Sequence, residues 1–498
     1  MQMHTLFGKS VAVLLCELLI LLPMTGCAGR KATEVPQPPT LEEGTLRTRL
    51  QEPYLQLFET AATLTFGAAD IQAQRDAFRA SEKSCVARFK DHAKQYAKQM
   101  EIAQRSLRET STKLTDAERR QLHCRIQNLD LLQRESEMLS QHAIPTAYEN
   151  LSAKLDLIEK WPALYRQTQE EIANESYMKR HWSDVKDIGF REIAPNQRDD
   201  IKKGQEAIEE LRRNGLLPPA LDNKKIQDYV NSVAQNVATY SDLKIPLQLT
   251  VLQSREINAF ALPGGYLFVQ RGLLEATDNE TELAGVLAHE IAHMTARHGH
   301  KLMRRATIAS IFYQAAQVAA VVLTGGVVGP GLYYAMQYGF YSLGLILDLK
   351  LLGVNRDYEL EADQLGVQYA WNAGYDPAGF IQFFDKMATR EGYVNGVSWF
   401  RTHPPFFERM VATQREIMFL PSKPGMITQT SAFEEMEKEL VPVTAQAAKE
   451  EAERPRLLIT REEGCQPPQK LDYTPGQPIE QLCASPMVVV PGAKPSSQ

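Results

Sequence analysis

The 498-residue sequence predicts a mostly helical α+β fold, in which a long helical N-terminal region precedes a domain with a small edge sheet. Residues 41–193 are rich in Gln, Glu, Lys, Arg, Ala and Leu and contain only three prolines, which favours several long helices. Residues 246–253 and 266–270 have the composition of strands. Residues 283–300 carry apolar side chains at helical spacing without a proline.

Composition narrows the class of protein. The 55 Lys+Arg residues are balanced by 61 Asp+Glu, so the basic excess of nucleic-acid-binding proteins is missing and we exclude that class. A length of 498 residues exceeds what one hydrophobic core usually organises. We therefore expect a signal peptide at 1–26, a lipidated linker at 27–40, a helical region at 41–200, a main domain at 201–440, and a proline-rich, loosely ordered tail at 441–498.

The first thirty residues have the features of an export signal. Lys9 precedes an apolar run at 11–22, and small residues precede Cys27. Thr25-Gly26-Cys27 resembles a lipobox, which implies cleavage before Cys27 and lipidation of its thiol. A plain signal peptide or an uncleaved anchor is the alternative. By the same resemblance, Ala28 rather than aspartate after the cysteine implies the outer membrane, so we expect a lipid-anchored protein on the periplasmic side of the cell envelope.

The main domain is organised around an HExxH motif, formed by His289, Glu290 and His293. On a helix, positions i and i+4 share a face, so both imidazoles can bind one metal ion, with Glu290 beside a water molecule at that metal. Thr277 and Glu280 are spaced as a capping box for this helix.

A catalytic zinc ion normally has three protein ligands. Glu359 and Asp363 lie four residues apart in the segment RDYELEADQLG, where a helix is expected. We predict that Glu359 is the third ligand and that Asp363 accepts a hydrogen bond from a ligand histidine. Taken alone, this acidic pair indicates an ordinary charged helix face. Together with the HExxH motif, it indicates a metal ligand and its partner instead.

These motifs, in this order and after the segment NAFALPGGY at 258–266, resemble the HtpX and CAAX-prenyl-protease family of HExxH zinc metallopeptidases, in particular its soluble bacterial periplasmic lipoproteins. The resemblance covers about residues 220–419. It implies a gluzincin metallopeptidase domain at 201–440 that binds one Zn²⁺ per chain and hydrolyses peptide bonds.

The resemblance also assigns a substrate strand. In such proteases an edge strand beside the zinc holds the substrate through backbone hydrogen bonds. Here it would include Asn258, Ala259 and Phe260, with Gly264 and Gly265 permitting close backbone approach. A simple turn between two strands is the alternative interpretation.

Two later segments bear on the site. The segment WFRTHPPFFER resembles a further family element, in which His403 binds the reaction intermediate or the open zinc position and Arg409 pairs with a nearby carboxylate. Residues 306–353 are predicted to form either helices that cover the cleft or a membrane hairpin, and interrupting polar residues favour the former. His298 and His300 are expected to be packing or surface residues.

Four cysteines remain beyond Cys16 in the signal and Cys27: Cys85, Cys124, Cys465 and Cys483. A helical hairpin that turns at 112–116 would hold Cys85 and Cys124 far apart, whereas Cys465 and Cys483 are close enough in the tail to close a loop.

The sequence thus predicts a zinc metalloendopeptidase of the bacterial cell envelope that cleaves misfolded or misassembled envelope proteins, with Glu290 as general base for the zinc-activated water. The alternative is an envelope chaperone or assembly adaptor with a quiescent zinc site. The long helical region favours this alternative.

Overall fold

The computed structural model describes residues 46–109, 114–179, 197–213, 217–255, 257–299, 356–387, 407–453, 465, 468 and 478–490. Helices dominate this part of the chain and accompany one three-stranded sheet, which confirms the mostly helical α+β fold. Within the same residues, no helix combines the length and apolar character needed to cross a membrane. The signal peptide, Cys27, His300, residues 306–353 and His403 lie outside the described residues.

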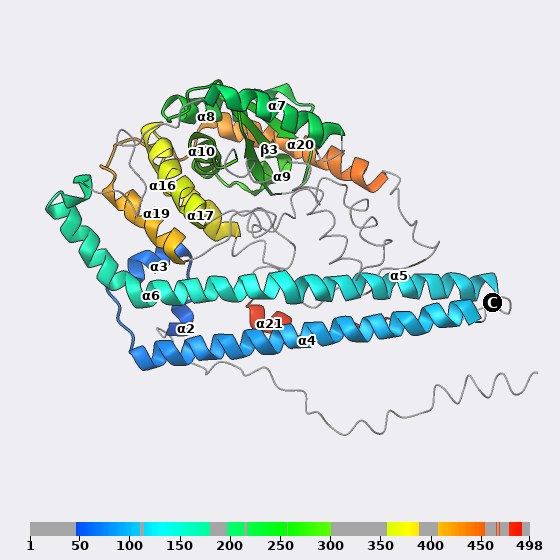
Figure 1. Cartoon of the computed structure of the whole chain (residues 1–498). Helices are drawn as coiled ribbons and strands as arrows, with labels where there is room; N and C mark the ends of the chain where they lie inside the picture. The colour runs from blue at the N-terminus through cyan, green and yellow to red at the C-terminus, as the bar shows by residue number, and fades with distance from the viewer. Residues whose placement is uncertain are drawn as a thin grey trace, which may run out of the picture.

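The N-terminal region is built on a long helical hairpin (Figure 1). The short helices α2 (Leu46–Arg49) and α3 (Tyr54–Ala61) precede α4 (Ala68–Glu109), whose 42 residues span about 63 Å. After the turn, α5 (Asp116–Met138) runs back along α4 and continues through the π-helical turn η1 (Leu139–Ala143) into α6 (Ile144–Ala173). A 3₁₀ turn, η2 (Ser176–Lys179), follows.

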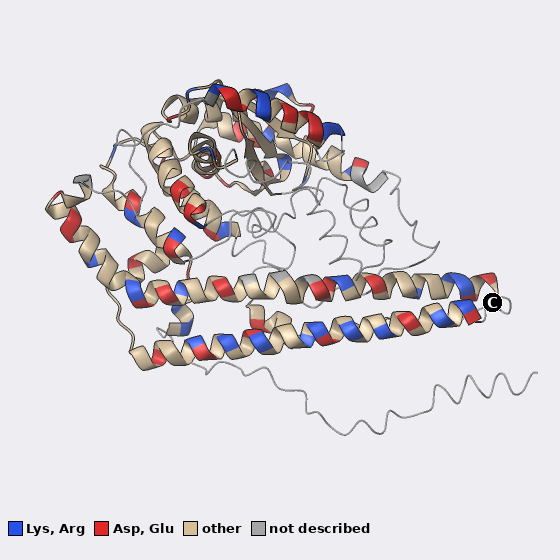
Figure 2. Cartoon of the chain, viewed as in Figure 1, with Lys and Arg blue, Asp and Glu red and all other residues tan. Residues whose placement is uncertain are grey.

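Helix α4 buries only a narrow line of side chains. Most buried positions up to Tyr96 recur every third or fourth residue, and polar residues interrupt the line. The buried residues are Ile71, Gln74, Phe78, Ser81, Cys85, Phe89, His92, Ala93, Tyr96 and Ala103. Gln74, Ser81 and His92 explain why the sequence shows no clean apolar heptad, although the packing has that spacing. Acidic and basic residues recur along both long helices of the hairpin (Figure 2).

The hairpin register keeps Cys85 and Cys124 apart. The hydroxyls of Ser81 and Tyr148 lie 2.7 Å apart, which places α6 residues near 144 opposite Cys85. Cys124 is twenty residues before that position, or about 30 Å along the helix. The difficulty predicted for a bridge between the two is therefore confirmed.

Both hairpin cysteines pair with the tail instead. The disulfides are Cys85–Cys483 and Cys124–Cys465, so the two tail cysteines do not close a loop with each other, although their spacing would allow it. The short helix α21 (Ile479–Ala484) packs on α4 through buried Ile479 and Leu482. Further on, the Tyr96 hydroxyl donates to the Val488 carbonyl over 3.0 Å. Sequence spacing favoured the short loop, but three-dimensional packing brings these distant segments together.

The sheet lies in the second half of the chain. Helices α7 (Gln197–Arg213) and α8 (Lys224–Thr239) lead into β1 (Gln248–Leu252), β2 (Ala259–Leu262) and β3 (Tyr266–Gln270). The order is β1-β3-β2, with β1 parallel and β2 antiparallel to β3. Strand β2 is therefore an edge strand, as the substrate-strand hypothesis requires.

Two glycines shape the β2–β3 turn. Gly264 and Gly265 have φ of +88° and +86°, a region that L side chains rarely adopt. A Cβ on Gly264 would lie 2.5 Å from the Ile201 Cα, and one on Gly265 would lie 2.3 Å from the Pro246 carbonyl oxygen. The close approach predicted for these glycines is thus made by this chain's own backbone.

The remaining helices join the two regions. After α9 (Arg271–Ala276) and α10 (Glu280–Thr295) come α16 (Arg356–Asn372), α17 (Gly379–Lys386), α19 (Phe407–Phe419) and α20 (Ser431–Glu453). One apolar core contains residues from α3, α4 and α6 together with α8, α10, α16 and α17. The Arg415 guanidinium of α19 also pairs with Glu171 of α6 at 2.9 Å. The division points at 200 and 440 fall inside α7 and α20.

Candidate metal centre and active site

Helix α10 begins at Asn279, which is its N-cap residue. The Asn279 side chain accepts from the Glu282 N–H over 2.9 Å. The predicted capping box of Thr277 and Glu280 is wrong, because Thr277 ends α9 and its hydroxyl donates to the Leu274 carbonyl over 3.0 Å. Nearly all of α10 is buried, so its polar side chains need partners inside the protein.

The three predicted metal ligands lie together. One candidate ligand atom from each of His289, His293 and Glu359 falls within 4.8 Å of the others. The two Nε2 atoms are 3.0 Å apart, and Glu359 oxygens lie 3.6 Å from His289 Nε2 and 3.4 Å from His293 Nε2. Ligands at zinc bond lengths in a tetrahedron are separated by about 3.3 Å, so this arrangement fits a zinc ion.

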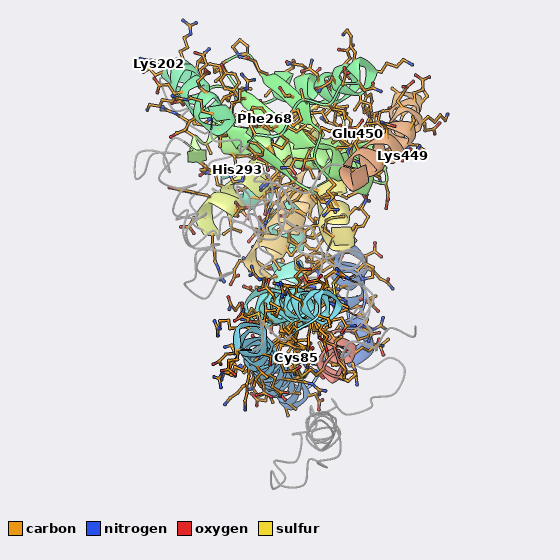
Figure 3. All side chains as sticks on the ribbon, turned by 90° about the vertical axis from the view of Figure 1, so that its right-hand side faces the viewer. Cys85, Lys202, Phe268, His293, Lys449 and Glu450 are labelled. Atoms are coloured by element: carbon orange, nitrogen blue, oxygen red, sulfur yellow. A yellow bond between two sulfur atoms is a disulfide. The ribbon has the colours of Figure 1, made fainter. Side chains whose placement is uncertain are left out.

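A glycine brings α16 against α10. A Cβ on Gly366 would lie 3.0 Å from both the N and Cα atoms of His289, so a larger residue would push the helices apart. The contact allows the acidic face of α16 to reach the histidines. Figure 3 shows His293 in this part of the molecule and Cys85 in the hairpin layer.

His289 is backed by two charged residues. Its Nδ1 lies 2.8 Å from an Asp363 oxygen, as the sequence predicts. The Arg409 guanidinium, fully buried, donates to Asp363 over 2.8 Å and lies 3.3 Å from Glu359. The predicted pairing of Arg409 with a carboxylate at the site is therefore present.

The electrostatics favour positive charge among these groups. Burial lowers the pKa of His289, but the Asp363 and Glu359 carboxylates outweigh it and raise that pKa to about 9. A bound cation would occupy the same favourable field. With its nitrogen and oxygen donors, the site suits Zn²⁺, which ligands of this kind bind in tetrahedral sites.

Glu290 lies between the metal ligands and the edge strand. Its side chain is 2% exposed, and the Ala261 N–H of β2 donates to its carboxylate. Burial raises the pKa of Glu290 to about 8, while His289 lowers it, Glu359 raises it and Arg409 lowers it. A buried carboxyl with a raised pKa is a stronger base than an exposed one.

The other predicted strand residues have different surroundings. Asn258 is fully buried before β2, and its carbonyl accepts from the Gln270 N–H over 3.0 Å. Ala259 packs in the core, and Phe260 stacks on Phe268 at 5.0 Å under α7. The side chains of Ala259 and Phe260 thus pack within the protein, and the backbone groups of β2 form its outer edge.

Two residues at the site were not predicted. His298, expected to be a packing or surface residue, is buried with its Nδ1 2.8 Å from the Nδ1 of His293. Phe380 of α17 stacks on the His289 ring at 5.1 Å. A histidine five residues after the second motif histidine could have indicated from the sequence that His298 lies near the site. The position of Phe380 depends on tertiary packing, so no sequence pattern predicts it.

The HExxH helix, with a glutamate ligand from a later helix, defines the gluzincin type of metallopeptidase site. Residues 220–417 match the profile of Peptidase family M48. The chain therefore carries an M48 peptidase domain over this range, which confirms the predicted family relationship.

Curated relatives match the same part of the chain. A putative beta-barrel assembly-enhancing protease of Vibrio cholerae is 30% identical over 189 residues, 37% of each chain. The beta-barrel assembly-enhancing protease of Yersinia pestis is 27% identical over 234 residues, 45% of this chain and 46% of the relative. Mitochondrial metalloendopeptidase OMA1 of Schizosaccharomyces pombe is 30% identical over 185 residues, 36% and 50% of the two chains. The match thus spans about half or less of each relative.

Proposed function

We propose that this chain is a zinc-dependent metalloendopeptidase that hydrolyses peptide bonds in misfolded or misassembled proteins of the bacterial cell envelope. The observation that carries the proposal is the position of Glu290, which lies next to the His289, His293 and Glu359 cluster and accepts a hydrogen bond from edge strand β2. Base, metal ligands and substrate strand would then meet at one place.

His289, His293 and Glu359 would hold the zinc ion. When bound, zinc lowers the pKa of a water ligand and polarises the scissile carbonyl. Glu290 takes a proton from the attacking water and passes it to the leaving amide nitrogen. Arg409 and Asp363 keep the ligand side chains in place, as their buried contacts with Glu359 and His289 suggest.

Strand β2 would bind the substrate backbone. Because Asn258 and Gln270 are a hydrogen-bonded pair, the antiparallel pattern turns the backbone groups of Ala261 away from β3. The Ala261 N–H reaches Glu290, so a substrate strand added beside β2 would run past the general base. Pairing through backbone groups suits unfolded segments of varied sequence.

The cellular setting is part of the proposal. The export signal with Cys27 supports a lipid anchor on the periplasmic side of the envelope, most simply in the outer membrane. Two relatives bear names that refer to β-barrel assembly, which supports envelope proteins as substrates.

The test compares the zinc-loaded full chain with its Glu290→Gln variant on an unfolded protein such as casein. We expect one zinc per chain in both proteins, and at least a 100-fold lower cleavage rate in the variant because the proton acceptor is lost. Glu435→Gln, an exposed change on α20, is the matched control. Equal cleavage by the Glu290→Gln and wild-type proteins would refute the proposal.

The adaptor function is a second candidate, supported by the length of the α4–α5 hairpin, which carries none of the site residues. The same variant separates the two functions in cells that lack the wild-type protein. Adaptor function survives Glu290→Gln, whereas proteolytic function does not.

A further inference from the structure

His298 is brought back to the metal site by an unusual turn after α10. The helix ends at Thr295, and Arg297 has a left-handed backbone with φ of +56°. The Arg297 guanidinium forms two 2.7 Å hydrogen bonds with Asp200 of α7, which hold this conformation. The next residue, His298, therefore turns toward the helix instead of toward solvent.

The His298 ring contacts side chains of both α10 and α16. Its Nδ1 lies 2.8 Å from the Nδ1 of His293, and its Nε2 lies 3.1 Å from an Oε2 of Glu361. Its face stacks on Tyr358 at 4.4 Å with an interplanar angle of 13°. The ring is 2% exposed, so these protein contacts replace water.

These distances fix where the protons lie when His293 binds a metal through Nε2. The His293 proton must then be on Nδ1, which lies 2.8 Å from His298 Nδ1 and can donate to it. His298 must accept there, so its own proton lies on Nε2 and is donated to Glu361. The chain of donors runs from His293 through His298 to Glu361.

We propose that His298 is a positioning residue that holds the metal ligand His293 in its Nδ1-protonated form, with Glu361 fixing the tautomer of His298. The inference rests on the proposed function, since it assumes that His293 binds the metal. Orienting partners of this kind usually contribute 10- to 100-fold to metal affinity, although they never touch the metal. His289 uses a different device, a direct carboxylate contact with Asp363.

The test uses two amide substitutions of the same residue. In His298→Asn the amide takes the place of Nδ1 and can still accept from His293. In His298→Gln the amide takes the place of Nε2 and can reach only Glu361. Zinc affinity is measured on the full chain by competition with a chromogenic chelator, and the visible spectrum of the Co²⁺-loaded protein reports the ligand geometry. His92→Asn, a buried histidine of α4 away from the site, is the control.

We expect His298→Gln to lose 10- to 100-fold in zinc affinity and to shift the Co²⁺ bands, and His298→Asn and His92→Asn to remain within about threefold of wild type. Equal affinity of the Gln and Asn variants would overturn the proposal, whether both are weak or both are normal. If His298→Gln loses its helical circular dichroism, the Glu361→Gln variant is measured in its place. A zinc affinity and Co²⁺ spectrum like those of the wild type support a relay that needs only a hydrogen-bond acceptor at position 361. A 100-fold loss of zinc affinity in Glu361→Gln overturns the proposal. Wild-type protein that binds no zinc would instead refute the proposed function.

Discussion

The α4–α5 pair and the α10–α16 pair are two helix contacts built in different ways. In the hairpin, side chains from a narrow line separate the helices, and two disulfides fasten it to the tail. Between α10 and α16, Gly366 lets the backbones approach so closely that a single Cβ would meet His289 at 3.0 Å. The hairpin accommodates polar residues between its helices, whereas any side chain at Gly366 would press against His289 of α10.

The difference shows what each contact does. In the hairpin, side-chain packing and disulfides hold two long helices together although their sequence has little apolar content. Backbone contact fixes the distance between the helices, and with it the relative positions of His289, His293 and Glu359 that they carry. Changes in the hairpin should therefore lower stability alone, and changes near α10 should lower stability and metal affinity together.

The largest expected effect comes from Arg409. Arg409→Met leaves Asp363 and Glu359 buried without their shared cation, which costs about 3–5 kcal/mol of unfolding free energy and lowers zinc affinity. Arg415→Met on the same helix removes the ion-pair contact with Glu171 and serves as control, with unchanged zinc affinity. Urea denaturation and chelator competition measure the two quantities. Equal effects of both changes on zinc would contradict the prediction.

Removal of the buried disulfide tests the hairpin. The double variant Cys85→Ala, Cys483→Ala should lose about 2–4 kcal/mol of unfolding free energy, because the unfolded chain gains freedom. Zinc affinity and casein cleavage should stay at the wild-type level. Loss of zinc binding in this variant would show that the hairpin and the metal site are coupled, against the distinction drawn above.

Helix α17 offers a smaller change near the site. A Cβ on Gly379 would lie 2.4 Å from the Thr281 carbonyl oxygen, so Gly379→Ala should cost about 1–3 kcal/mol and move Phe380 away from His289. We therefore expect weaker zinc binding as well. Gly374→Ala is the control: its φ of +91° costs about 1 kcal/mol, but its Cβ meets nothing within 4 Å. Identical zinc affinities for the two variants would argue against this role of the glycine contact.

The smallest effects concern helix caps. Asn279→Ala removes the half-buried cap residue of α10 and should cost about 1 kcal/mol in thermal or urea unfolding. Thr115→Ala removes the exposed capping box of α5, where water can replace the lost hydrogen bonds, so the decrease in stability should be smaller. The reverse order of the two effects would contradict this explanation.

The sequence was enough to predict that His289, His293 and Glu359 lie together, as they do in the structure. His289 and His293 share a helix face by the geometry of any α-helix, and Glu359 with Asp363 repeats that spacing on the next ligand helix. The strands at 248–252 and 266–270 could also be predicted from the sequence, since apolar and β-branched residues concentrate there.

Long-range contacts were not readable from spacing. The disulfide partners are 398 and 341 residues apart, and only the packing of α21 and the tail on the hairpin brings them together. His298 was missed because its position depends on the left-handed turn at Arg297, which an ion pair with distant Asp200 holds. Helix periodicity carries no information about such a turn.

The Cys85–Cys483 bridge makes a covalent ring of the whole intervening chain. The HExxH helix and the ligand helix α16 both lie within it, so a single backbone cut anywhere inside the ring opens it without releasing a fragment. An enzyme of this kind that nicks itself, or is nicked by another protease, would migrate as two pieces on a reducing gel and as one species on a non-reducing gel. Its fragments would part only where the surroundings reduce disulfides.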